Sequence, residues 1–294
     1  MTSTPMAGTP VPPPVTARLA HREDPAPRFT DLLAAEWLTV RSLRSTPWLL
    51  ALSALAALAV NINAVHSDLP YIDRPHPAVP GFPPYVYDPL FHGLNAIAAD
   101  LMALAAASFG ALAVFGAYAT GTIRGTFAAV PDRRAVILAR VTVVTALTLV
   151  LGAVVSTASF FTTNAMLASR HVGLSLHDPG CLRAVLAYAL VVPVCALIGM
   201  AFGAVLRHPT ASLVGVVALL FLLPLLFGGD HYRLLKEIGN CLPLSALARL
   251  THNPNSTAPL GGYPATVTGS WLALAGWALL STVVTVTVVR RRDV

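Results

Sequence analysis

The sequence has few charged residues. Asp, Glu, Lys and Arg together make up only 11% of the 294 residues, whereas a soluble domain carries about 25%. Hydrophobic residues account for 55% of the chain, and the mean hydropathy is +0.69. So many apolar residues exclude a largely disordered chain, and so little charge excludes an ordinary soluble domain. We expect an integral membrane protein.

Cysteine and lysine are also scarce. Three cysteines are too few for a disulfide-stabilised scaffold. The one lysine, Lys236, lies between Leu235 and Glu237, whereas a phosphate-binding P-loop ends in Gly-Lys-Ser or Gly-Lys-Thr. If ATP drives this protein, a separate chain therefore binds the ATP. The arginines stand between apolar runs rather than on one face with aromatic residues, which argues against nucleic-acid binding.

The amino-terminal part of the chain has two sections. Residues 1–28 are rich in proline and lack apolar periodicity, which predicts a disordered cytoplasmic tail. Residues 29–45 have the periodicity of an amphipathic helix. Its expected polar side carries Asp31, Glu36, Arg41 and Arg44. We interpret this helix as lying in the membrane interface, and a solvated helix packed on nothing is the alternative.

Apolar runs long enough to cross a membrane dominate the rest of the chain. A helix needs about 20 residues to cross the hydrocarbon core. Pro193 and Pro224 lie inside the fourth and fifth runs and predict kinks there. We therefore expect an all-α polytopic membrane protein in which residues 46–294 form a six-helix transmembrane domain. The expected spans are residues 47–65, 95–118, 141–168, 184–206, 209–229 and 267–289.

Basic residues predict the orientation of these spans. They concentrate before the first span, after the second and after the last, and the opposite connections carry about half as many. Because an excess of Lys and Arg marks the cytoplasmic side, both termini are expected in the cytoplasm. On the outer side, residues 230–265 mix leucines with polar residues, which predicts short amphipathic or re-entrant helices before the last span.

The connection after the second span is the most informative stretch of the sequence. From Gly116 to Arg134 it stays mildly apolar, contains several threonines, and then turns basic. Gly121 and Gly125 permit close approach of another backbone. Two interpretations stay open: the segment docks a cytoplasmic partner, or its arginines only hold the topology.

This connection resembles the segment after the second helix in permease subunits of type-2 ABC transporters, of the compact six-span bacterial kind. In that family the segment typically reads Gly-Glu-Tyr, two variable residues, and Gly-Thr-Ile-Arg. The residues in register here are Gly116, Tyr118, Gly121, Thr122, Ile123 and Arg124. The chain departs from the pattern at Ala117, where the family has glutamate. The amphipathic start, the Leu242-Pro243 pair and the arginine-rich end are also similar, so the resemblance extends over residues 29–294.

The resemblance implies the permease subunit of an ATP-driven exporter in the bacterial cytoplasmic membrane. A separate ABC ATPase subunit would bind ATP and Mg²⁺ and grip residues 119–134, so this chain would bind no cofactor and would not be an enzyme. A second permease copy or a paralogue would complete the substrate pathway as a dimer. The alternative is a membrane scaffold or sensor subunit that transports nothing, which the long Pro- and Tyr-rich first outer loop favours.

Asp100 is the one acidic residue near the interior of an expected span. A buried carboxylate on the second span would contact a polar or cationic substrate. An acid close to the end of a helix, by contrast, reaches the interface at little cost. We favour the outer interface for Asp100 and keep the substrate-pathway role as the alternative.

Glycine and cysteine pairs give two further expectations. Gly199 and Gly203 form a small-xxx-small pair on the fourth span, which predicts close helix packing inside one subunit. Cys181 and Cys241 both fall in expected outer connections and are a candidate disulfide pair. The histidines lack the close spacing of metal ligands, so we expect no metal site.

Overall fold

The part of the chain that the structure describes is almost entirely helical. The structure is a computed structural model, and it describes residues 28–42, 45–72, 87–119, 132–229, 232–256 and 260–291. These residues contain no strand, and six of their helical segments are long and apolar enough to cross a membrane. The expectation of a helical protein is therefore confirmed for the described residues, and six of the helices have the length and composition to cross a membrane.

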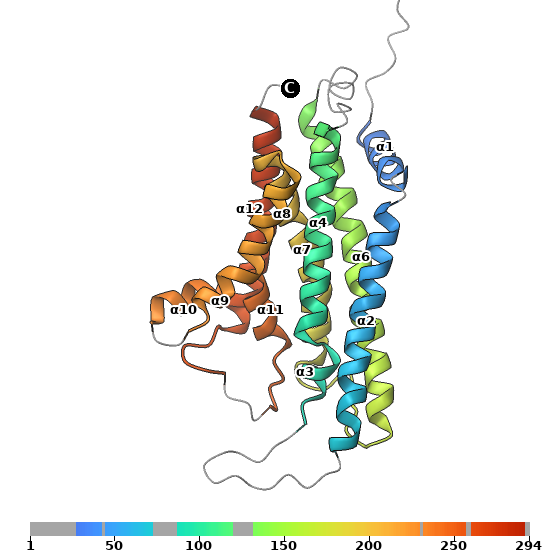
Figure 1. Ribbon diagram of the computed structural model, residues 1–294, viewed down its shortest axis with the longest axis vertical. Coiled ribbons are helices and arrows are strands. Elements are labelled where there is room, and N and C mark those ends of the chain that lie inside the picture. The colour runs from blue at the N-terminus through green and yellow to red at the C-terminus, as the bar shows by residue number, and fades with distance from the viewer. Residues whose placement is uncertain are drawn as a thin grey trace, which may run out of the picture.

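The long helices run along one another as a bundle (Figure 1). Their bounds are α2 Ser45–Ile72, α4 Ala96–Ala119, α6 Arg133–Ala168, α7 Cys181–Leu206, the composite of α8 Pro209–Val217 and α9 Leu223–Phe227, and α12 Val267–Arg291. The shorter helices are α1 Phe29–Ser42, α3 Pro89–Gly93, α10 Arg233–Asn240 and α11 Pro243–Thr251. One end of the bundle carries α1 and the C-terminal end of α12, and the other carries α3, α10 and α11 (Figure 1). These are called the α1 end and the α11 end below.

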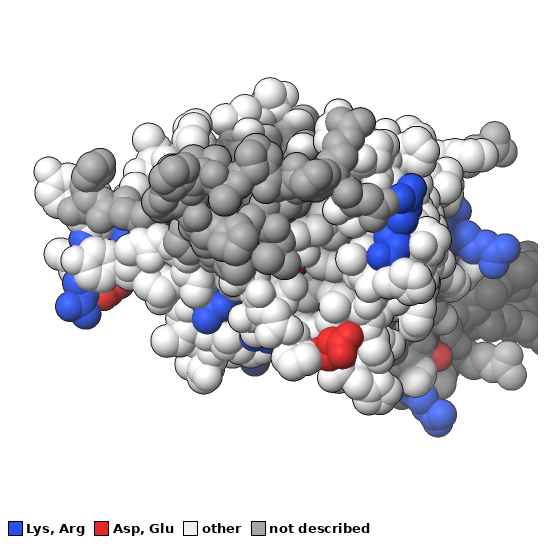
Figure 2. Space-filling model, turned by 90° about the horizontal axis from the view of Figure 1, so that it is seen from below, with Lys and Arg blue, Asp and Glu red and all other residues white. Residues whose placement is uncertain are grey.

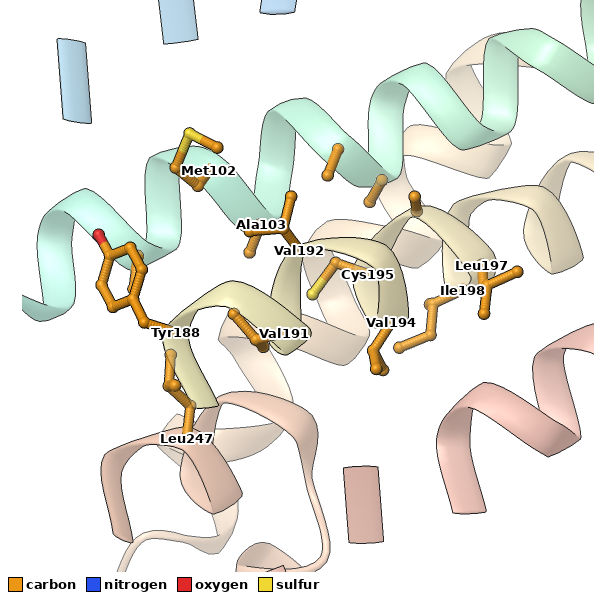
Figure 3. Packing of buried hydrophobic residues seen from close by; sticks show 14 of the residues in the cluster. Met102, Ala103, Tyr188, Val191, Val192, Val194, Cys195, Leu197, Ile198 and Leu247 are labelled. Atoms are coloured by element: carbon orange, nitrogen blue, oxygen red, sulfur yellow. The ribbon is translucent and has the colours of Figure 1, made fainter. Parts of the chain in front are cut away.

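Helix α7 lies at the centre of the bundle. It packs against α4, α6, α11 and α12. Figure 3 shows Met102 and Ala103 of α4 and Leu247 of α11 around it, and all three side chains are buried. On the outside of the bundle, by contrast, large apolar side chains are exposed: Leu52 is 68% exposed and Leu225 79%. An apolar core inside an apolar surface suits a helix bundle that lies in lipid.

Glycines bring α4 and α7 into backbone contact. A Cβ on Gly199 would overlap the carbonyl oxygen of Ala107, and one on Gly203 would lie 2.8 Å from the carbonyl oxygen of Ala111. From the other side, a Cβ on Gly110 of α4 would overlap the carbonyl oxygen of Ala196. Gly199 and Gly203, the pair predicted from the sequence to pack closely, therefore face α4 of the same chain. Only glycine allows the two backbones to approach this closely.

The first turn of α3 has a clear cause in the sequence. The Asp88 side chain accepts hydrogen bonds from the backbone N–H groups of Leu90 and Phe91, and Pro89 occupies the first turn. Aspartate before a helix and proline at its start are both favoured, because the first N–H groups lack partners within the helix. The sequence interpretation did not include this helix, although Asp88 followed by Pro89 is a typical start of a helix.

Pro224 changes the geometry of the fifth span. Residues Ala218–Leu222 form a π-helical turn between α8 and α9, in which the N–H of Leu223 donates to the carbonyl of Ala218. Pro224 follows at once and has no N–H to continue the regular ladder. The expected kink at this proline takes the form of a local widening of the helix.

Two helices extend beyond the spans expected for them. The third span was expected to begin at residue 141, but α6 begins at Arg133, where Asp132 caps the N–H groups of Arg134 and Ala135. The first was expected to end at residue 65, but α2 continues to Ile72. Both expectations followed hydropathy, whereas a helix continues as long as its backbone is hydrogen-bonded.

The segment before the last span forms two short helices. Figure 1 shows α10 crossing the direction of the bundle and projecting from it, while α11 packs against α7 and α12. Leu247 and Leu250 of α11 are buried, whereas Leu234 and Ile238 of α10 are exposed. The indole Nε1 of Trp277 on α12 donates to the carbonyl oxygen of Cys241 at 2.8 Å, which fixes the turn between the two helices.

Candidate functional site

Helix α1 is attached to the bundle by a small apolar contact of its own. Leu32 is buried against Val136 and Ala139 of α6, and this cluster is separate from the main core. Apolar residues three and four apart place one face of each helix against the other. The helix expected to lie in the interface is therefore packed on α6, so the alternative of a helix packed on nothing does not describe it.

A buried ion pair joins α1 to α6. The guanidinium of Arg140 donates from Nε and Nη2 to the two carboxylate oxygens of Glu36, both at 2.8 Å. Each side chain is only 9% exposed. Paired parallel hydrogen bonds of this kind are the strongest form of a carboxylate–arginine contact. They fix the rotation of α1 about its axis as well as its position.

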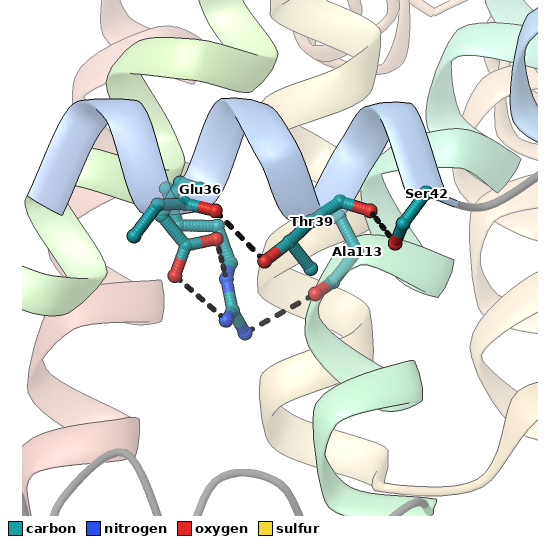
Figure 4. A network of polar contacts seen from close by, with 6 residues as sticks. Glu36, Thr39, Ser42 and Ala113 are labelled. Carbon is teal, nitrogen blue, oxygen red and sulfur yellow. Dashed lines mark hydrogen bonds and ion pairs between the residues drawn. The ribbon is translucent and has the colours of Figure 1, made fainter.

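The same arginine also reaches α4. Its Nη1 donates to the carbonyl oxygen of Ala113 at 3.3 Å, as Figure 4 shows. Glu36, Arg140 and the Ala113 carbonyl therefore connect three helices at the α1 end, and we call them the α1–α4–α6 junction. Ala113 lies two turns before the end of α4, close to the connection to α6. A movement of α4 or α6 at either end of that connection would therefore displace the groups that form the junction.

The sequence interpretation of Glu36 and Arg140 was wrong. Glu36 was expected on the polar face of the first helix, and Arg140 in the connection before the third span. Both are buried, because each neutralises the charge of the other. The pair spans 104 residues and has no periodicity to reveal it. A signal was present nonetheless: Arg140 heads a long uncharged run, and a buried arginine needs an acidic partner.

The residues expected to contact an ATPase lie at the end of α4 and beyond it. Gly116 is on the last turns of α4, and a Cβ added there would meet no atom within 4 Å. Tyr118 also belongs to α4, but its side chain is outside the described residues, as are Gly121, Thr122, Ile123 and Arg124. The motif therefore begins on a helix held by the junction and continues into the connection between two helices that the junction joins.

No family model and no curated protein sequence matches this chain. Its six long apolar helices, by their length and composition, fit a multi-pass membrane protein. Within the described residues, the junction joins three helices by polar contacts at the α1 end.

Asp100 lies one turn into α4 and is partly buried. It is within electrostatic range of Tyr188 and Cys195, so it is on the side of α4 that faces α7. The Tyr188 hydroxyl is fully buried and lies near Asn61 without hydrogen-bonding geometry. Among the described residues Asp100 forms no ion pair, and its role in a substrate pathway stays a prediction.

The candidate disulfide between Cys181 and Cys241 is not formed. Both residues are free cysteines: Cys181 is buried at the start of α7, and Cys241 is exposed in the turn after α10. One thiol points into the core and the other is on the surface, so the shared outer location on which the pairing was based does not bring them together. Among the described residues no group of three or more His, Cys, Asp or Glu is arranged to hold a metal ion.

Proposed function

We propose that this chain is the permease subunit of an ATP-driven exporter of the ABC type, coupled to a separate ATPase subunit. The observation that carries the proposal is the α1–α4–α6 junction, because it ties together the two helices on either side of the Gly-Thr-Ile-Arg connection. The family-like motif supplies the expected contact with the ATPase, and the junction supplies a rigid link from that contact into the bundle.

In the proposed mechanism ATP binds and is hydrolysed only in the partner. Closure of the ATPase pair pushes on residues 119–134, and the push reaches α4 at Gly116 and α6 at Arg133. Because Arg140 holds Glu36 and the Ala113 carbonyl together, α1, α4 and α6 move as one body. α4 packs closely on the central helix α7, so its tilt also moves the core of the bundle.

In the same proposal, a second copy or a paralogue completes the pathway between two bundles. The spans that would line the pathway are apolar, which favours a hydrophobic or amphipathic cargo over a small ion. Asp100 would then contact a polar or cationic part of that cargo. The low number of charges in the spans gives no ladder of sites for an ATP-independent ion channel.

Copurification tests the proposal. The chain is extracted from its native membranes in a mild detergent, and the proteins that accompany it are identified by mass spectrometry. We expect an ABC-type ATPase in near-equal amount. Recovery of the chain with no ATPase across several detergents would reject the exporter and favour the scaffold or sensor subunit.

Substitution of the motif tests the coupling role. Thr122→Ala with Arg124→Ala is expected to abolish most of the ATPase recovery, because the two residues lie in the segment proposed to dock it. Arg41→Ala is the matched control, since Arg41 is an exposed arginine of α1 at the same end of the bundle but outside residues 119–134. Equal ATPase recovery with the motif variant and the control would refute docking through this segment.

A further inference from the structure

A pocket opens at the α11 end between α9, α10, α11 and the chain that leads to α12. Its volume is about 330 Å³, and its walls include Phe227 from α9 and Leu260 from the connection. Three basic side chains line it as well: Lys236 of α10, Arg249 of α11, and His252 just after α11. No aspartate or glutamate is among the described residues that line the pocket.

Arg249 in this pocket and Arg183 beside it interact with neutral oxygens rather than with acids. Arg249 donates from Nε to the carbonyl oxygen of Ala265 at 2.6 Å. Nearby Arg183 donates to the carbonyl oxygens of Leu250 and His252 and is close enough to Arg249 for the two cations to repel each other. Neither arginine forms an ion pair within the described part of the chain. An anion placed here would relieve this repulsion.

His252 adds a second, independent observation. Its Nε2 is buried and has no hydrogen-bond partner among the described residues. A buried polar nitrogen without a partner is costly, and in a native protein such a group is usually satisfied by a ligand or by water. Next to two cationic side chains, the group that satisfies it best is an anionic oxygen.

The walls of the pocket are held in place by hydrogen bonds. Lys236 Nζ donates to the carbonyl oxygen of Gly228 at 3.0 Å, and Asn240 Nδ2 donates to that of Tyr263 at 3.0 Å. Together with the bond from Arg249 to Ala265, these contacts join α10 and α11 to the flanking chain. The pocket is therefore built before any ligand arrives, which lowers the entropy cost of binding.

The surroundings of the pocket are apolar. On α9, Leu225 and Leu226 are 79% and 67% exposed, and on α10, Leu234 and Ile238 are also exposed. Seen from the α11 end, Lys and Arg lie at separate places on the described surface rather than in one continuous field (Figure 2). A cationic pocket beside exposed leucines matches the shape of an anionic lipid, whose phosphate is polar and whose chains are apolar.

From these observations we propose that the pocket binds the phosphate group of an anionic lipid, with Lys236, Arg249 and His252 as the binding residues. The acyl chains lie along the exposed leucines of α9 and α10. This site is independent of the proposed exporter function, because it needs neither an ATPase nor a transported substrate.

Thermal unfolding of the purified full chain in a non-ionic detergent tests the site, since a ligand that binds only the folded protein raises the unfolding temperature. The probes are short-chain phosphatidylglycerol, short-chain phosphatidylcholine and glycerol 3-phosphate. We expect phosphatidylglycerol to stabilise the protein and phosphatidylcholine to have little effect, because the choline cation is repelled. Stabilisation by glycerol 3-phosphate as well would show that a soluble phosphate also occupies the site.

Variants separate this site from a general effect of lipid charge. Lys236→Gln and His252→Leu should each weaken phosphatidylglycerol binding roughly tenfold, the scale expected when a hydrogen bond to a charged group is lost. Lys236→Arg should retain most of the binding. Arg249→Gln is a weaker test than these variants, because it also removes the hydrogen bond from Arg249 to the Ala265 carbonyl oxygen.

Arg233→Gln is the matched control on the same helix. Arg233 is exposed, lies outside the pocket lining and pairs with Glu237. Because arginine is always protonated in proteins, the substitution removes one positive charge, as Lys236→Gln does. We expect Arg233→Gln to bind phosphatidylglycerol as the unaltered chain does. No stabilisation by phosphatidylglycerol, or equal weakening in Arg233→Gln and Lys236→Gln, would overturn the proposal.

Discussion

Glu36 and Arg140 show how a single pair of residues can position a whole helix. Removing two charges from water is costly, and the cost is offset here by two hydrogen bonds between the partners and a third to the Ala113 carbonyl. Breaking such a pair from one side is far more damaging than replacing both partners, because it leaves one buried charge unpaired. Arg140 is central to the junction, since it lies on α6 and donates hydrogen bonds to both α1 and α4.

Glu36→Gln should therefore destabilise the protein by about 3 kcal/mol, the scale found when one partner of a buried ion pair is removed. The midpoint of unfolding in detergent measures the effect. Combining Glu36→Gln with Arg140→Met should recover part of the loss, because no buried charge then remains. Glu237→Gln is the control: it breaks the exposed pair with Arg233 and should leave the midpoint nearly unchanged. Equal effects of the two single substitutions would contradict a structural role for the junction.

The cysteines provide a second prediction for individual residues. Cys241 is exposed and Cys181 is buried, and neither is bonded. We expect a maleimide to modify Cys241 in the folded protein without prior reduction and to leave Cys181 unmodified, as peptide mass spectrometry would show. Modification of Cys241 only after reduction would restore the disulfide that the sequence suggested.

At the scale of elements, the contact between α4 and α7 is the tightest that the glycines define. Glycine lets the backbones of two helices approach until the carbonyl of one meets the Cα of the other. Gly199 and Gly110 make this contact from opposite sides. The seam places the second span, which leads to the proposed coupling segment, directly on the most buried helix of the bundle.

Gly199→Ala should accordingly destabilise the bundle by about 2 kcal/mol, within the range for overpacking a tight core. The cause is the overlap of the new methyl group with the Ala107 carbonyl oxygen. Gly276→Ala in α12 is the matched control, because a Cβ there meets no atom within 4 Å and alanine favours a helix over glycine. Unfolding midpoints of both variants in one detergent make the comparison. A Gly199→Ala protein as stable as the Gly276→Ala protein would contradict the seam.

The sequence was a good guide to the elements and a poor guide to the contacts between them. The six apolar runs could be predicted as helices from their length, because a backbone in lipid must satisfy its own hydrogen bonds and a helix does so within one segment. Helix α6 begins before the span expected from residue 141, and Arg140, expected in a connection, lies in the helix and pairs with Glu36. The walls of the cationic pocket come from several short elements, and nothing in the spacing of Lys236, Arg249 and His252 foretells their meeting.

At the scale of the whole molecule, the two ends of the bundle differ in character. The α1 end carries the junction and the first turn of α6, with Arg133 and Arg134. The α11 end carries the pocket, the short helices and exposed apolar residues. The distribution of basic residues in the sequence predicts that the α1 end faces the cytoplasm.

This orientation predicts which positions an impermeant maleimide reaches in intact cells. Cys241, at the α11 end, should be labelled from outside. In a Cys241→Ser background, Ser42→Cys at the exposed end of α1 should be labelled only after the membrane is permeabilised. Labelling at position 42 in intact cells of that double variant would reverse the orientation and place the coupling motif on the wrong side for an ATPase.

The most direct test of the central claim is a photo-crosslink from the coupling motif itself. A photoreactive amino acid replaces Thr122 in one variant and Ser67, exposed near the opposite end of α2, in another. After illumination of native membranes, mass spectrometry identifies the proteins attached to each position. The proposed function predicts an ABC-type ATPase crosslinked from position 122 and not from position 67. Crosslinks from position 122 that contain no ATPase, in cells that express the full chain, would contradict it.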